Sequence, residues 1–155
     1  IKIIMETIKL KGVIDFKIVR KNGDVETWTV NNTITNAGKA QLALLAGDAS
    51  ATPFTYLAVG TSTTAPAASQ TALVAEVTDT GLARANATVS RITTTETNDT
   101  LQLTYTWTAT GSKTIEEAGI FNAASSGTML GRALTSTKTL ATNDQLTITY
   151  KVIFA

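Results

Sequence analysis

The chain has 155 residues, 43% of them hydrophobic, which suits one domain with a sizeable core. Its 13 basic and 12 acidic residues give a formal net charge of +1, too small for a global field that would attract nucleic acid or an acidic membrane. The absence of histidine and cysteine excludes disulfides, thiolate nucleophiles, imidazole bases and the commonest zinc sites.

A short apolar arm, residues 1–6, precedes a strongly alternating segment. Residues 8–20 carry apolar side chains at most even positions and mainly charged ones between them, which predicts a strand with one buried and one exposed face. The dipeptide Asn22-Gly23 then favours a turn. Residues 25–30 are therefore expected to return as the second strand of a hairpin.

A helix is expected after this hairpin. Residues 31–36 are turn-like, and Asn36 is expected to cap a helix over residues 37–46 that stops at Gly47. The leucines expected to cover a sheet are Leu42, Leu44 and Leu45.

The rest of the chain alternates short apolar runs with turn signals. Further strands are expected at residues 54–59, 83–94, 101–108, 114–121, 128–134 and 146–154. Residues 60–69 form a loop of small residues, and residues 70–77 fit either a short helix or an extended segment. About a fifth of the chain is threonine, which favours strands. The pattern predicts an all-β fold, a mainly antiparallel β-sandwich or barrel with one or two short helices, in which residues 1–155 form one β-rich domain with an N-terminal arm at residues 1–6.

Two stretches of the chain share a local pattern. Residues 97–105 and 142–150 both read Thr-Asn-Asp followed by alternating apolar positions and a tyrosine. The simplest interpretation is that two antiparallel strands use the same turn. Asp99 and Asp144 are expected to bind their own backbone in these turns, because neither belongs to an alternating calcium loop.

Candidate catalytic groups are few. Glu116 and Glu117 are the only adjacent carboxylates, and on a strand such neighbours point to opposite faces. Glu117 is expected to point inward and to pair with Arg84, Arg91 or Arg132, as a structural ion pair rather than a catalytic acid. We therefore predict no enzyme activity and no catalytic, cofactor-binding or metal-binding residue. A carboxylate glycosidase that uses Glu116 or Glu117 is the enzymatic alternative.

Aromatic residues suggest a further alternative. Trp28, Tyr105 and Trp107 could form a stacking platform for sugars in a carbohydrate-binding, receptor-recognition module. Tyr105 and Trp107 fall on the apolar face of their predicted strand, however. Core packing is therefore the favoured interpretation.

An ordered series of motifs runs through residues 30–135. The motifs are, in order, Thr35-Asn36-Ala37-Gly38, Leu57-Ala58-Val59-Gly60, Gln70-Thr71-Ala72-Leu73-Val74-Ala75-Glu76-Val77, Arg84, Thr114-Ile115-Glu116-Glu117-Ala118-Gly119-Ile120-Phe121-Asn122 and Met129-Leu130-Gly131-Arg132. Together they resemble the N-terminal attachment domain of phage tail-fibre proteins, in which this domain anchors a long fibre to the baseplate. The resemblance implies a virion structural protein that docks on other subunits.

The length of the chain suggests a second role. No coiled-coil heptads, collagen-like triplets or β-helical repeats follow the motifs, so we expect a stand-alone attachment protein rather than a full fibre. The size also resembles that of capsid decoration (cement) proteins, which sit as trimers on the shell. Tail attachment and capsid decoration therefore both remain open. Either role implies a virion protein that is assembled in the host cytoplasm. Its expected partners are the major capsid protein or baseplate and tail proteins, and neither nucleic acid nor a membrane is expected to bind. We also expect a homo-oligomer, with a trimer favoured.

Two segments are expected to make the docking contacts. The arm is apolar enough to add a strand to a neighbouring subunit. The outward lysines of the first strand, Lys9, Lys11 and Lys17, either prevent unwanted pairing with strands of other molecules or contact an acidic virion surface. The loop at residues 60–69 lacks charge and could mould against a partner. The candidate docking residues are Ile1, Ile3, Ile4, Met5, Thr7, Lys9, Thr61, Thr63, Thr64 and Pro66.

Overall fold

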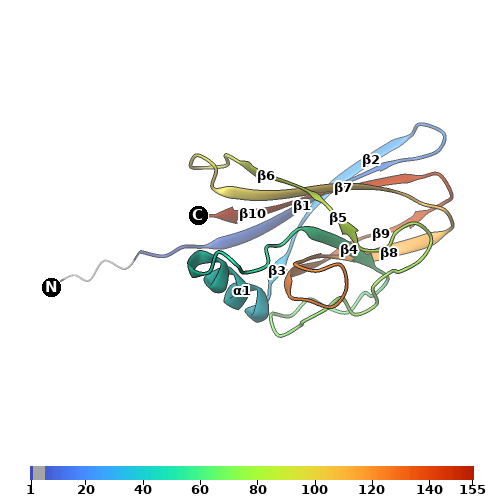
Figure 1. Ribbon diagram of the computed structural model, residues 1–155. Helices are drawn as coiled ribbons and strands as arrows, with labels where there is room; N and C mark the ends of the chain where they lie inside the picture. The colour runs from blue at the N-terminus through green and yellow to red at the C-terminus, as the bar shows by residue number, and fades with distance from the viewer. Residues whose placement is uncertain (2–5) are drawn as a thin grey trace.

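The computed structural model describes residue 1 and residues 6–155. Two five-stranded antiparallel sheets lie face to face, and the one helix of the described residues, α1 (Asn36–Gly47), lies beside them (Figure 1). The first sheet, in the order β2-β1-β10-β7-β6, consists of β1 (Leu10–Val19), β2 (Val25–Asn31), β6 (Thr88–Ile92), β7 (Thr100–Thr108) and β10 (Gln145–Phe154). The second sheet, in the order β3-β9-β8-β4-β5, consists of β3 (Thr33–Ile34), β4 (Tyr56–Gly60), β5 (Ala85–Asn86), β8 (Lys113–Phe121) and β9 (Met129–Leu140). The predicted all-β fold with a short helix is confirmed.

Two stretches of chain pass from one sheet to the other. Residues 25–34 leave the first sheet at Asn32, whose amide donates to the Gly12 carbonyl at 3.1 Å, and continue in the second sheet as β3. Residues 85–92 leave the second sheet at Ala87, whose amide donates to the Thr55 carbonyl at 2.8 Å, and continue as β6. These shared corner strands make the sandwich resemble a flattened barrel.

The corner at Asn32 requires close approach of the backbone. A Cβ on Gly12 would lie 1.7 Å from Asn32 Oδ1, and one on Gly131 would lie 2.1 Å from Asn32 Nδ2. Nδ2 donates to the hydroxyl of Tyr150, and burial raises the pKa of that tyrosine. The two glycines therefore leave room for the Asn32 side chain at the point where the strand leaves the first sheet.

The core lies between the sheets and confirms the predicted hairpin. Ile14, Phe16 and Ile18 of β1 are at most 1% exposed, as the period-2 pattern requires. Burial of each such side chain contributes about 1.5–3 kcal/mol. Ile8 is the exception in the pattern: it is 78% exposed because β1 begins only at Leu10.

The helix has a different cap from the one predicted. Thr35, not Asn36, is the N-cap, since its extended backbone lets Oγ1 accept from the Gly38 amide at 2.9 Å. Leu42 and Leu45 pack against the core, as expected. Leu44 does not cover a sheet and is 48% exposed, because its position two residues after Leu42 turns it about 200° around the helix.

Several predicted boundaries were wrong. The predicted turn at residues 31–36 is the end of β2 followed by β3 and the helix start, and the single strand at residues 83–94 is divided into β5 and β6. The strand at residues 128–134 continues to Leu140. Residues 70–77 form neither a helix nor a regular strand, apart from one bridge between Glu76 and Gly60. A hydrophobic pattern shows which face is buried but not which strand is the neighbour.

The two similar stretches do form the same turn. Asn98 and Asn143 adopt left-handed φ values of 60° and 71°. The Asp99 carboxylate accepts hydrogen bonds at 2.8 Å from the amides of Thr94, Thr95 and Glu96. The Asp144 carboxylate accepts from the amides of Ala141 and Lys21 at 2.8 and 2.9 Å. These hydrogen bonds, chiefly from Glu96 and from Ala141 respectively, lower the pKa of each carboxyl.

Candidate docking site

A buried ion pair lies at the centre of the second sheet. Glu117 on β8 and Arg132 on β9 are both 0% exposed, and Arg132 Nε donates to Glu117 Oε2 at 2.6 Å. The predicted pairing of Glu117 with an arginine is confirmed. The expected direction was wrong, because the β-bulge between Ile115 and Glu117 turns the carboxylate away from the space between the sheets and towards residues 74–75. Of the three candidate partners, Arg91 is exposed and Arg84 pairs with another carboxylate.

This ion pair fixes the chain that follows β4. Glu117 accepts from the amides of Val74 and Ala75 at 3.2 and 2.8 Å, while Arg132 Nη1 donates to Gln70 Oε1 at 3.1 Å. Residues 61–82, which we call the pinned loop, are thereby attached to the sheet. Gly60, at the start of the loop, leaves space for the carboxylate, because a Cβ there would lie 2.3 Å from Glu117 Oε1.

A second ion pair holds the far end of the same loop. Arg84 makes a bidentate contact with Glu76, at 2.9 Å from Nε and 2.6 Å from Nη2. Its Nη1 also donates to the carbonyls of Ala123 and Ser126, and the guanidinium lies 3.6 Å from the ring centroid of Phe121. Arg84 therefore joins the pinned loop to the turn between β8 and β9.

The carboxylates considered for catalysis do not face a common space. Glu117 is buried beneath the pinned loop and its two oxygens accept three hydrogen bonds, whereas Glu116 is on the opposite face of β8 and accepts from the Thr137 hydroxyl at 2.8 Å. Within residues 6–155, no group of three or more acidic side chains is placed to hold a metal ion. The geometry supports a structural role for Glu117.

The aromatic residues considered for sugar binding are engaged in packing. Trp107 is 3% exposed, donates from Nε1 to the Ala83 carbonyl at 2.8 Å and lies edge-on to Tyr105. Trp28 stacks on Phe16 with ring centroids 5.1 Å apart. Core packing is thus the interpretation that the contacts support.

The predicted docking residues lie in two separate places. Ile1, Thr7 and Lys9 are exposed, while Ile3, Ile4 and Met5 lie outside the described residues. The loop residues belong to the pinned loop, where Thr61, Thr63 and Thr64 are exposed and Pro66 is half-buried. No hydrogen bond or ion pair in the described part of the chain joins the two sets.

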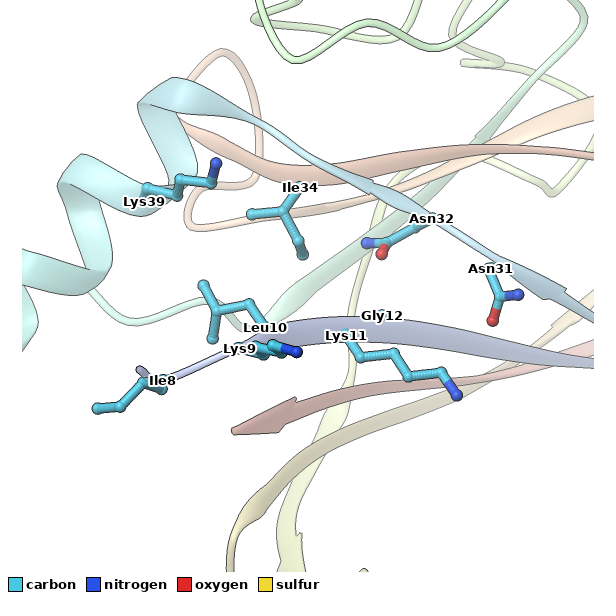
Figure 2. A pocket seen from close by; sticks show the side chains of 9 residues that line it. All are labelled: Ile8, Lys9, Leu10, Lys11, Gly12, Asn31, Asn32, Ile34 and Lys39. Atoms are coloured by element: carbon cyan, nitrogen blue, oxygen red, sulfur yellow. The ribbon is translucent and has the colours of Figure 1, made fainter. Parts of the chain in front are cut away.

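A groove lies beside the start of β1. Because residues 25–34 leave the first sheet at Asn32, β1 has no strand neighbour on that side before Gly12 within the described residues. The space between β1, β3 and α1 has a volume of about 680 Å³ (Figure 2). Side chains that line it include Ile8, Lys9, Leu10, Asn32, Ile34 and Lys39.

The groove is positively charged. Lys9, Lys11 and Lys39 line it, no carboxylate does, and none of the three lysines forms an ion pair with a described residue. Of these residues the sequence pointed to Lys9 as a docking residue, and to Lys11 only as one of the outward lysines that could contact an acidic surface. Ile34 and Lys39 were missed because the groove exists only where a strand changes sheets, and the sole signal was the doublet Asn31-Asn32, which resembled a simple turn.

In the part of the chain that the structure describes, no helix has the length and hydropathy needed to span a membrane. The profile of the family described as podophage GP4 fiber I protein gp80 matches residues 30–153, a range that contains every motif behind the resemblance to tail-fibre proteins. No curated protein and no solved structure gives a significant match. The chain therefore belongs to the podophage GP4 fiber I protein gp80 family and is a structural protein of a bacteriophage tail fibre.

Proposed function

We propose that this chain is a non-enzymatic docking subunit that attaches to other virion subunits. The observation that carries the proposal is the pinned loop. Its stretch at residues 61–69 is uncharged and largely exposed, and it is held by hydrogen bonds from the Thr61 amide to the Ala75 carbonyl and from the Asn36 amide to the Ala68 carbonyl, at 2.9 and 2.8 Å. A pre-ordered surface loses less conformational entropy on binding than a flexible one.

The family match favours a partner in the tail. We infer that the partner is a baseplate or tail protein, reached through an attachment domain of the kind that the motifs at residues 30–135 resemble. Capsid decoration, with the major capsid protein as partner, stays a prediction from chain length that no structural observation favours.

The assembly that we propose is a homo-oligomer, with a trimer favoured. Residues 1–155 would act as one domain, and its arm at residues 1–6 would add a strand to a neighbouring subunit. The protein would assemble in the host cytoplasm and would bind neither nucleic acid nor membrane.

Light scattering on the purified chain is expected to give three times the chain mass of 16.3 kDa. A monomer across the measurable concentration range would contradict self-association.

Rebinding to particles tests the docking function. Particles that lack the protein should take up the purified chain and sediment with it. Changing Thr61 and Thr63 to lysine should weaken this binding about ten-fold, because two buried ammonium groups would have to be desolvated at the interface. The matched control changes Thr95 and Thr97, two exposed threonines of another loop, to lysine and should bind normally. Failure of the unmodified chain to rebind would refute docking, and hits on a glycan array would favour carbohydrate recognition instead.

A further inference from the structure

The start of β1 presents an unpaired backbone edge to the groove. The amide of Lys9 donates to the Ala155 carbonyl, and the amide of Ala155 donates to the Lys9 carbonyl at 2.9 Å. The N–H and C=O of Lys9 therefore both point towards the end of β10. Backbone groups alternate in direction along an antiparallel strand, so the N–H and C=O of Leu10 point the other way, into the groove. Gly12, two residues later, follows the same rule, since its carbonyl accepts from Asn32. Along the described chain no strand pairs with Leu10 on this side.

The side chains beside this edge alternate in character. Leu10 and Ile34 point into the space between β1 and β3, which gives the groove an apolar floor (Figure 2). Lys9 and Lys11 flank Leu10 and are exposed, and Lys39 extends from α1. A strand placed against this edge would therefore meet apolar groups with one set of alternate residues and lysines with the other.

We propose that this groove binds an extended segment of another virion protein, in which acidic and apolar residues alternate, by adding that segment as a strand to the free edge of β1. The inference rests on the proposed docking function and names its site and the chemistry of its partner. The partner's main chain would bond to Leu10, its apolar side chains would contact Leu10 and Ile34, and its carboxylates would contact Lys9 and Lys11.

Two other occupants fit the groove less well. A polyanionic glycan would satisfy the lysines but would leave the apolar floor and the main-chain groups of Leu10 without matching contacts. The arm of a second copy is apolar, but its one acidic side chain, Glu6, is offset by Lys2, so it brings no net negative charge to a positively charged groove. An acidic and apolar peptide satisfies all three features.

Labelled peptides test the chemistry of the partner. A short peptide in which glutamate and valine alternate should bind the full chain in a fluorescence-anisotropy titration, and added salt should weaken the binding. A peptide of alternating lysine and valine should not bind, and one with the same glutamates and valines in two separate blocks should bind more weakly. Equal binding of all three peptides, or no binding of the first, would overturn the proposal.

Paired variants test the geometry. Changing Lys9 and Lys11 to glutamate should weaken binding of the alternating peptide about ten-fold, whereas changing Lys17 and Lys21, exposed lysines outside the groove, to glutamate should leave the binding unchanged.

Leu10→Pro and Leu10→Ala both remove the leucine side chain, but only proline also removes the N–H that faces the groove, at an edge where proline is tolerated. Binding should therefore be weaker in Leu10→Pro. Equal affinities of these two variants would exclude strand addition, and equally tight binding of dextran sulfate to both would assign the groove to polyanions.

The particle-rebinding assay separates this inference from the proposed function. If the unmodified chain rebinds and the variant with Lys9→Glu and Lys11→Glu does not, both proposals are supported. If both rebind equally, the groove is not the docking site, although the docking function stands. If the unmodified chain does not rebind, the docking function fails whatever the peptides do.

Discussion

The pinned loop and the β1 groove use charge in opposite ways. Around the pinned loop, Glu117 of β8 pairs with Arg132 of β9 and Glu76 of the loop pairs with Arg84, and these contacts hold an exposed segment on the sheet. In the groove, three lysines line an open strand edge without an acidic partner among the described residues. The comparison indicates that one region uses its charges to fix shape, while the other leaves them available to a partner.

The difference has an energetic consequence. A buried charge that loses its partner keeps the cost of desolvation, whereas an exposed lysine is solvated whether or not a partner is present. Substitutions in the two ion pairs that hold the pinned loop should therefore act on folding stability, and substitutions of the groove lysines should act on binding.

The largest expected effect is at the buried ion pair. Arg132→Met should lower the free energy of unfolding by about 3–5 kcal/mol, because it leaves the Glu117 carboxylate buried without a cation. Urea denaturation measures the change. The double variant Glu117→Gln with Arg132→Met should recover part of the loss, and a loss below about 1 kcal/mol in the single variant would contradict the structural role of the pair.

The next effect is at the glycine beneath the pinned loop. Gly60→Ala should cost about 1–3 kcal/mol, since its Cβ would lie 2.3 Å from Glu117 Oε1 and 2.6 Å from the Ala75 carbonyl oxygen. Gly47→Ala, at the end of α1, is the matched control, because nothing lies within 4 Å of its Cβ. Thermal unfolding should show a decrease for the first variant and no decrease for the second. Equal melting temperatures would mean that the loop does not fit closely at Gly60.

A smaller and pH-dependent effect is expected at Asp144, whose carboxylate, like that of Glu117, accepts several hydrogen bonds. Hydrogen bonds, first from the Ala141 amide and also from the Lys21 amide and Arg20, lower the pKa of Asp144 in the folded protein. The stability that this provides is complete above the unfolded-state pKa of about 3.9 and is lost as the pH falls through the lower folded-state pKa. Asp144→Asn should therefore cost about 1–2 kcal/mol at pH 7 and progressively less below pH 4.

Urea denaturation at a series of pH values measures this dependence. Asp24→Asn, in the exposed turn of the first hairpin, is the control and should change stability by less than about 0.5 kcal/mol. A difference for Asp144→Asn that stays constant down to pH 2 would show that the carboxylate charge is not the cause.

The smallest effect on stability is expected in the groove. Changing Lys9 and Lys11 to glutamate should alter the free energy of unfolding by less than about 0.5 kcal/mol per site, because both side chains are exposed and form no ion pair with described residues. Urea denaturation at low salt checks this. A loss comparable with that of Arg132→Met would show that these lysines, too, serve the fold, and the contrast between the two regions would disappear.

The sequence predicted the parts of the fold that depend on local pattern. Alternation placed Ile14 and Phe16 in the core. The sequence also predicted that Glu117 pairs with one of three arginines, although alternation with Ile115 gave the wrong face because of the β-bulge between the two residues. The repeated Asn-Asp turns were also predictable, because asparagine tolerates left-handed backbone and aspartate accepts from nearby amides.

The parts that were missed depend on long-range pairing. No local signal shows that the chain changes sheets at Asn32 and Ala87, because a strand reads the same whichever neighbour it has. The groove follows from the first of these corners, so Ile34 and Lys39 could not be assigned to it from the sequence. The pinned loop was likewise unpredictable, since Gln70 and Arg132 are 62 residues apart in the chain.

Electron microscopy of intact particles is the most direct test of the claim that this protein docks in the tail. Virions would be labelled with a gold-conjugated antibody against an exposed epitope of the chain. We expect gold at the tail, where a fibre protein attaches, and no gold on the capsid shell. Gold distributed over the capsid shell, or particles that carry no label although the protein is made during infection, would contradict it.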